Sequence, residues 1–166
     1  MIRRNFLITG SLLGISSMLK AETTTHFEKE FKEVEALIAA VQQHMFPAGT
    51  KLPAAQEMHV TQFLFETASH PSYDKDIRAF IIAGAQELKR REKGNFIFYT
   101  DKEKEYALRT YEETPYGSNW LSRIMTLTLE ALLCDPIYGS NIKEKGWQTL
   151  HAYGGYPRPQ SRYISL

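Results

Sequence analysis

The chain has 166 residues and a formal net charge of +1, with 20 Lys and Arg residues against 19 Asp and Glu residues. This length fits one domain with a hydrophobic core. The balanced charge, without a basic stripe interleaved with aromatic residues, argues against a nucleic-acid-binding protein. The sequence has one cysteine, which excludes an internal disulfide framework and a Cys-x-x-Cys-His haem attachment site.

The N-terminal segment has the layout of an export signal. A basic head precedes a moderately apolar run at residues 6–19, which is shorter than the roughly 20 apolar residues that a membrane-spanning helix needs. The pattern favours a twin-arginine signal at residues 1–21, read by the twin-arginine translocase. A general secretory signal, an uncleaved anchor and a plain N-terminal helix are the alternatives. The residues that carry the predicted signal are Arg3, Arg4, Phe6 and Leu7.

Three amphipathic helices are predicted in the following part of the chain, within a mature domain at residues 22–166. Apolar residues recur at three- and four-residue steps from Phe27 to Met45, and Pro47 ends this pattern. The same periodicity predicts further helices at residues 54–68 and at about 73–91, the latter capped near Ser72 or Asp74.

The segment from Phe96 to Tyr99 is the one candidate strand in the sequence. It has no evident pairing partner, so it could equally be a hydrophobic tether laid across the helices. After it, Thr100 and Glu103 form a capping box that opens a charged helix. The residues expected on the buried side of that helix are Tyr106, Leu108 and Tyr111.

A last long helix is predicted after a break at residues 114–117, with Ser118 or Asn119 as its cap and Cys134 near its end. Beyond Cys134 the chain becomes rich in glycine, proline and aromatic residues. The sequence therefore predicts an all-α fold, a single helical domain with an irregular, aromatic and glycine-rich C-terminal extension.

No catalytic or cofactor motif is recognisable. The five histidines do not have the spacing of a His-Glu-x-x-His or Glu-x-x-His metal site. The Gly-x-Ser-x-Gly elbow, the Gly-x-Gly-x-x-Gly fingerprint and the phosphate-binding Gly-Lys-Ser are absent. We therefore predict no catalytic residue, no metal site and no bound cofactor in this chain.

The stretch from Asp135 to Pro157 combines turn-forming and aromatic residues. Pro136 biases Asp135 away from helical geometry, glycines allow close backbone approach, and Asn141 can close a turn through its side chain. The Tyr and Trp side chains fit either the core of the domain or an interface. Cys134, just before this stretch, is either buried and inert or an intersubunit thiol in an oxidising compartment.

These residues carry a family resemblance. The runs at residues 135–141 and 146–147, and the Gly-Tyr-Pro that ends at Pro157, resemble the C-terminal signature of the gluconate 2-dehydrogenase subunit 3 family. Phe46-Pro47, followed by Pro53-Ala54-Ala55, is similar to that family's proline-rich loop after the first helix. A twin-arginine signal is typical of the same family.

The resemblance implies a heterotrimeric, membrane-associated dehydrogenase. Its large subunit carries FAD and oxidises the sugar acid, and a multihaem cytochrome c subunit passes electrons to quinone. This chain would be the non-catalytic small (gamma) subunit in the periplasm, held at the inner membrane through the complex. It would bind the flavoprotein, support its maturation and supply the export signal for both.

The motif that carries the resemblance is also the candidate interface with the partner, although the sequence does not indicate which helix face would contact it. A stand-alone periplasmic enzyme with an unrecognised site, or a free export chaperone, remains as an alternative to the complex. The candidate interface residues are Asp135, Pro136, Tyr138, Gly139, Asn141, Gly146, Trp147, Tyr156 and Pro157.

Overall fold

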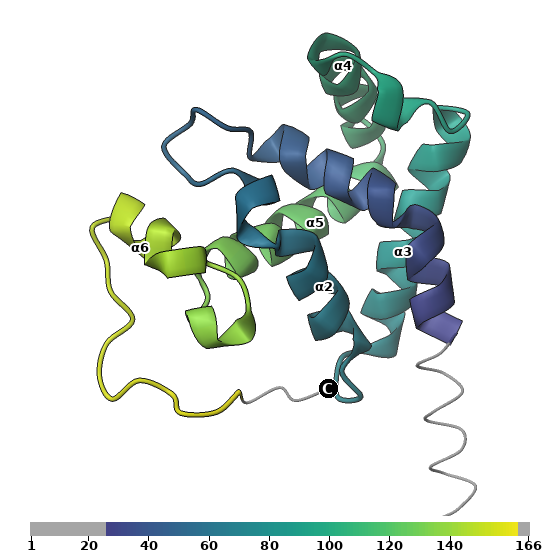
Figure 1. Ribbon diagram of the computed structural model, residues 1–166. Helices are drawn as coiled ribbons and strands as arrows, with labels where there is room; N and C mark the ends of the chain where they lie inside the picture. The colour runs from purple at the N-terminus through teal and green to yellow at the C-terminus, as the bar shows by residue number, and fades with distance from the viewer. Residues whose placement is uncertain (1–25, 163–166) are drawn as a thin grey trace, which may run out of the picture.

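The computed structural model describes residues 26–162, and the predicted export signal lies outside this range. Within it the chain is helical and contains no strand, which confirms the all-α prediction. Figure 1 shows the helices packed around α5 and a long irregular segment at the C-terminal side. The elements are the N-terminal helix (26–45), η1 (Ala55–Met58), α2 (Val60–Ser69), α3 (Lys75–Arg91), η2 (Phe96–Phe98), α4 (Asp101–Glu112), α5 (Pro115–Leu133), η3 (Pro136–Tyr138), η4 (Ile142–Glu144) and α6 (Lys145–Thr149).

Helix α5 forms the centre of the domain. It contacts α2, α3 and α4 along its length, and α6 and η1 near its C-terminal end. The main core joins its apolar residues to those of the N-terminal helix, α2, α3 and α4. A second, smaller cluster joins Ala131 and Leu132 of α5 to Ala55 and Met58 of η1 and to Val60. The C-terminal extension therefore begins where this second cluster lies.

Aromatic side chains fix the packing of α3 against α4 and α5. The indole of Trp120 is fully buried and donates from Nε1 to the carbonyl of Ile81 at 2.9 Å. The buried hydroxyl of Tyr111 donates to the carbonyl of Gly84 at 3.1 Å. A Cβ atom at Gly84 would overlap the Trp120 ring, so glycine allows the two helices to approach this closely.

A buried polar group joins three helices in the core. Gln42 of the N-terminal helix is fully buried and donates from Nε2 to Thr128 Oγ1 of α5 at 2.9 Å. Its Oε1 accepts from Thr61 Oγ1 of α2 at 2.6 Å. Because both ends of the amide are hydrogen-bonded, this polar side chain is accommodated without an unsatisfied group.

The predicted caps of α3 and α4 are confirmed, whereas one predicted core residue is wrong. Asp74 accepts from the amides of Asp76 and Ile77, and Thr100 and Glu103 form the reciprocal capping box. On α4, however, Tyr106 is 76% exposed, while Leu108 and Tyr111 are buried. Residues two apart on a helix point to nearly opposite sides, so Tyr106 and Leu108 cannot share the buried face.

The last helix begins earlier than predicted. The break expected at residues 114–117 is the first turn of α5 instead, with Thr114 as N-cap and Pro115 at the first helical position. Thr114 Oγ1 accepts from the amide of Gly117 at 3.0 Å. Proline is well tolerated at this position because the first amides of a helix have no intrahelical acceptor.

The helix predicted at residues 54–68 is divided at His59. This residue adopts φ 54°, in the left-handed region, and separates the short η1 turn from α2. The carbonyl of Met58 accepts a hydrogen bond from the hydroxyl of Ser140, in the C-terminal extension. The division therefore exposes a backbone acceptor to a distant part of the chain.

The candidate strand at residues 96–99 is also wrong, because this segment contains the 3-10 turn η2. Phe96 is fully buried, but Ile97 and Phe98 are 40% and 81% exposed. The segment is therefore anchored by Phe96 and by the partly buried Tyr99, while the two residues between them face solvent. Among residues 26–162, no helix has the length and apolarity needed to cross a membrane.

Candidate interaction surface

The C-terminal motif closes the end of α5. Asn141 is fully buried, and its Nδ2 donates to the carbonyl of Cys134 at 2.8 Å. Its Oδ1 accepts from the amide of Gly146 at 2.8 Å. The backbone of Asn141 has φ 46°, a left-handed conformation that asparagine adopts more readily than most residues. One side chain thus caps the helix and joins it to α6.

Trp147 completes this cap. Its Nε1 donates to the carbonyl of Leu133 at 2.6 Å, and only 9% of the residue is exposed. Gly146 lies directly against the carbonyl of Leu132, and a Cβ atom there would overlap it. The last carbonyls of a helix lack intrahelical donors, so the bonds from Trp147 and Asn141 satisfy the carbonyls of Leu133 and Cys134, which would otherwise need water.

Arg158, in the irregular segment after α6, contacts three residues of the C-terminal motif or next to it. Its guanidinium lies 4.5 Å from the centroid of the Trp147 ring and donates from Nη2 to Glu144 Oε1 at 2.7 Å. Its Nε lies 3.4 Å from Asp135 Oδ2. Asp135 also accepts from the amide of Ile137 at 3.0 Å and so caps η3. The predicted residues Asp135 and Trp147 are therefore joined by an arginine that the sequence pattern did not single out.

The turn at η3 is held by a second arginine. Pro136 is the first residue of η3, and Gly139 follows it with φ 84°, which favours glycine. Arg162 donates from Nε to the carbonyl of Ile137 at 2.6 Å, and its Nη1 lies 3.1 Å from Glu66 Oε2 of α2. No local sequence signal would have indicated the contacts of Arg158 and Arg162, because they depend on how the chain folds back on itself.

The segment after α6 is the exposed part of the motif. We call residues 150–157 the aromatic arm. Leu150, Tyr153 and Tyr156 are 53%, 78% and 89% exposed, and Pro157 is exposed as well. In Figure 1 this segment runs as an extended strip away from the helices before it returns toward them. Isolated exposed apolar residues are common, but two exposed tyrosines with an exposed leucine in one short segment favour an interface.

The predicted interface residues are thus in two groups. Asp135, Asn141, Gly146 and Trp147 serve the packing of the domain itself, through the contacts described above. Tyr156, together with Tyr153, presents its ring to solvent. The two interpretations of the aromatic residues, core and interface, therefore apply to different members of the same motif.

An open apolar groove lies beside the motif, between α2 and α5. It has a volume of about 630 Å³. Cys134, Tyr138 and Arg162 are among the residues that line it. Cys134 Sγ donates to the carbonyl of Ala131 at 3.3 Å, and burial raises the pKa of this thiol to about 11. The thiol is therefore protonated at neutral pH and a weak nucleophile. The apolar residues that line the groove are Phe63, Leu129 and Leu133.

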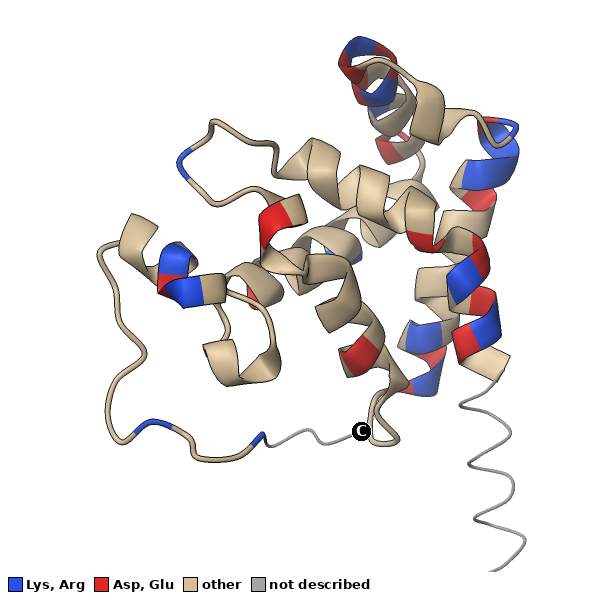
Figure 2. Cartoon of the chain, in the orientation of Figure 1, with Lys and Arg blue, Asp and Glu red and all other residues tan. Residues whose placement is uncertain are grey.

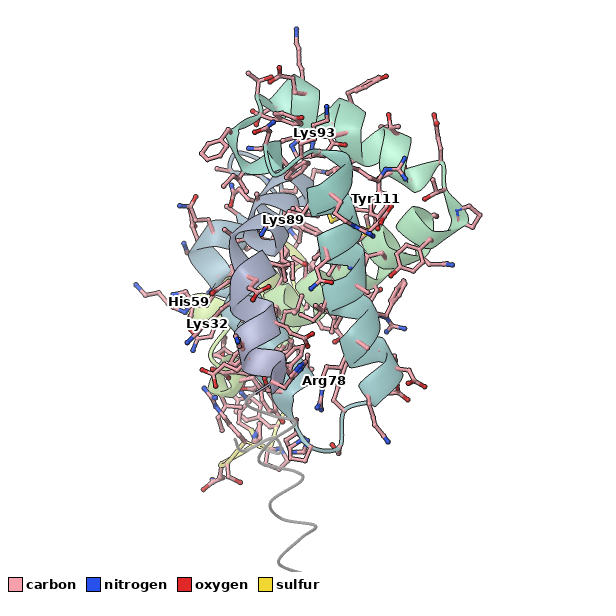
Figure 3. All side chains as sticks on the ribbon, turned by 90° about the vertical axis from the view of Figure 1, so that its right-hand side faces the viewer. Lys32, His59, Arg78, Lys89, Lys93 and Tyr111 are labelled. Carbon is pink, nitrogen blue, oxygen red and sulfur yellow. The ribbon has the colours of Figure 1, made fainter. Side chains whose placement is uncertain are left out.

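Charged residues gather elsewhere on the molecule. Figure 2 shows them mainly on the N-terminal helix, α3 and α4. At the end of α3, Lys89 Nζ donates to the carbonyl of Glu33 at 3.1 Å, and Arg90 pairs with Glu87. Arg91 lies over the ring of Tyr111, at 5.4 Å from its centroid. Figure 3 shows Lys89 and Tyr111 on this side of the molecule. These cations are engaged by neighbouring groups, and they complement the helix C-terminus.

Within residues 26–162, no group of three or more His, Cys, Asp and Glu side chains could hold a metal ion. His44 forms a pair instead, with Nε2 at 2.8 Å from Glu105 Oε2. This pair, with Arg109 on the other side, holds the pKa of Glu105 below its usual value. The pair joins the N-terminal helix to α4, and we interpret it as a contact that stabilises the fold.

The fold and these surfaces define a single-domain helical protein with candidate protein-interaction surfaces. A family model described as gluconate 2-dehydrogenase subunit 3 matches residues 19–155. The chain belongs to this family. The family is that of a subunit of gluconate 2-dehydrogenase, a multi-subunit enzyme. Neither the curated proteins nor the solved structures gave a match.

Proposed function

We propose that this chain is the non-catalytic small subunit of a periplasmic gluconate 2-dehydrogenase complex, and that it binds the flavin-containing large subunit. The observation that carries the proposal is the family match over residues 19–155, which spans all the described helices and most of the C-terminal motif. In the resemblance noted above, FAD and haem c belong to the partner subunits. The chain's own task is then binding.

The aromatic arm supports a binding role. Tyr153 and Tyr156 expose large, rigid side chains that combine an apolar face with a hydrogen-bonding tip. Arg158 holds the end of the arm through its contacts with Trp147 and Glu144. Since α6 precedes the arm and Arg158 holds its other end, the arm loses less conformational entropy when a partner binds to it.

The proposal extends to maturation and export of the flavoprotein. Arg3 and Arg4 lie outside the described residues, and the proposal rests for this part on their sequence pattern. A large subunit that lacks its own signal would cross the membrane folded, bound to the small subunit and read by the twin-arginine translocase.

Co-expression with the large subunit tests both parts. With the wild-type small subunit, we expect flavin-loaded large subunit in the periplasm. The double substitution Arg3→Lys and Arg4→Lys should leave the flavoprotein folded and flavin-loaded but in the cytoplasm. Normal periplasmic activity of the flavoprotein with this variant would refute shared export, and gluconate oxidation by the purified small subunit alone would refute the non-catalytic role.

A further inference from the structure

The groove between α2 and α5 has a mainly apolar wall that is open to solvent. Phe63 from α2 and Leu129 and Leu133 from α5 supply apolar surface, and Tyr138 of η3 also lines the groove. Its volume of about 630 Å³ is within the range of roughly 300–1,000 Å³ that is typical of binding pockets. It can therefore accept several side chains of a docked segment.

Two carboxylates border this groove, and they differ in their partners. Glu66 forms an ion pair with Arg162, with 3.1 Å between Oε2 and Nη1. The Glu130 side chain is exposed and has no hydrogen bond or ion pair with any residue in the range 26–162. Arg123 is the neighbouring cation that favours its charged form, but partial desolvation by the surrounding groups has the larger effect and raises the pKa of Glu130.

An apolar partner alone would be a poor occupant of this groove. Covering the groove would remove water from the Glu130 carboxylate, and a buried charge without a partner is costly. A cation on the docked segment would remove that penalty and would add a charge-assisted hydrogen bond. The groove is therefore complementary to a segment that presents apolar side chains together with one basic side chain.

We propose that this groove docks an apolar segment of the flavin-containing large subunit, with a Lys or Arg side chain of that segment placed against Glu130. The inference rests on the proposed function, since it assigns a location on this chain to the same partner. It adds a second contact region to the aromatic arm.

Cys134 provides a direct readout, because it lines the groove and is the only cysteine of the chain. The purified complex and the isolated small subunit are treated with a methanethiosulfonate reagent at the same pH, after reduction. We expect labelling of Cys134 to be at least about tenfold slower in the complex. Equal labelling rates in an intact complex would overturn the inference while leaving the proposed function in place.

Labelling of Cys134 also tests two other possible occupants of the groove, namely the C-terminal end of this chain and a second copy of it. If deletion of residues 163–166 accelerates labelling of the isolated chain to many times the wild-type rate, the chain's own end covers the groove. If dilution of the isolated chain accelerates labelling, a second copy covers it. Either result would overturn the inference. Failure of any complex to form would refute the proposed function itself, and the inference with it.

Substitutions of Glu130 test the proposed contact with a basic side chain of the partner. Glu130→Lys should weaken binding of the large subunit by at least about tenfold, and Glu130→Gln should weaken it less and reduce its dependence on salt. Glu113→Gln, at the exposed C-terminal end of α4, is the matched control and should bind as the wild type does. Unchanged affinity of Glu130→Lys would contradict the proposal.

The apolar wall is tested in the same way. Leu129→Asp should weaken binding by a similar factor, whereas Met125→Asp should not, since Met125 is exposed on the same helix but does not line the groove. Melting temperatures of the isolated variants show whether folding is preserved. If both variants fold and bind with wild-type affinity, the groove is not the docking site.

Discussion

Gly84 and Asn141 show how single residues determine the shape of this domain. Gly84 allows the Trp120 indole to lie directly on α3, and Asn141 connects the end of α5 to the turn before α6. At position 84 the absence of a side chain is needed, and at position 141 an amide that both donates and accepts is needed. We therefore expect that replacing either residue, even by one of similar size or polarity, lowers the stability of the domain.

Gly84→Ala is expected to destabilise the domain by about 1–3 kcal/mol, because the added methyl group would overlap the Trp120 ring. Chemical denaturation of the isolated subunit measures this change. Ala83→Ser, at the exposed neighbouring position, serves as the control and should stay within about 0.5 kcal/mol of the wild type. A Gly84→Ala variant as stable as this control would show that the helices separate easily.

Asn141→Asp is expected to destabilise the domain by about 1–3 kcal/mol at neutral pH, since it replaces a buried donor to the Cys134 carbonyl by a carboxylate. The same side chain could still accept from the Gly146 amide. Gln148→Glu makes the same exchange of an amide for an acid on α6 and is the control, because the bond from Gln148 to the Lys143 carbonyl is exposed to water, whereas that of Asn141 is not. Equal denaturation midpoints for both variants would contradict the capping role of Asn141.

At this scale, the sequence identified the residues of the motif but not their partners. Turn chemistry predicted that Asn141 bonds to the backbone, and it does. By contrast, Ser140 bonds to Met58, and Arg162 pairs with Glu66. Such contacts depend on tertiary packing, for which a local pattern contains no signal.

The helices show which local signals are strong enough to predict an element. The capping box at Thr100 and the Asp74 cap were both recognisable, because their side-chain geometry is local. The start of α5 at Pro115 differs from the predicted break, because proline interrupts a helix in its interior but is common at a first helical position. The left-handed His59 had no sequence signal at all.

The two acidic caps predict a pH dependence of stability. Backbone hydrogen bonds from Ile77 and Asp76 hold the pKa of Asp74 below its ordinary value, and bonds with Thr100 do the same for the pKa of Glu103. Because these pKa values are lowered by folding, the stabilisation is present above the ordinary values and is lost as pH falls through the folded-state pKa values.

Melting temperatures between pH 7 and pH 3 measure this effect. The double variant Asp74→Asn and Glu103→Gln cannot titrate at these positions, so its melting temperature should fall less over the acidic range than that of the wild type. Parallel curves for the two proteins would show that the caps do not contribute to the acid sensitivity of the domain.

For the whole molecule, the division of the C-terminal motif into a buried and an exposed group predicts two different phenotypes. Trp147→Ala should destabilise the isolated subunit by about 3–5 kcal/mol, because it removes a buried indole and its bond to Leu133. Tyr156→Ala should leave the melting temperature unchanged and weaken recovery of the large subunit, because its ring is 89% exposed.

Thermal melting of each isolated variant, followed by co-purification with the large subunit, separates these effects. Tyr106→Ala, at a tyrosine of α4 that is 76% exposed and lies outside the motif, provides the binding control. Full recovery of the partner by Tyr156→Ala would remove this residue from the interface. The sequence could not divide the motif in advance, since glycine and aromatic residues occur in both its buried and its exposed part.

The central claim is that this chain acts as a subunit bound to a flavoprotein. The most direct measurement is purification of the tagged full-length chain from native membranes, with flavin absorbance and haem staining of the proteins recovered with it. We predict a flavin-containing large subunit and a haem-stained cytochrome in constant proportion to this chain. Recovery of the chain without flavin or haem, under conditions that preserve gluconate oxidation in the same membranes, would contradict the account.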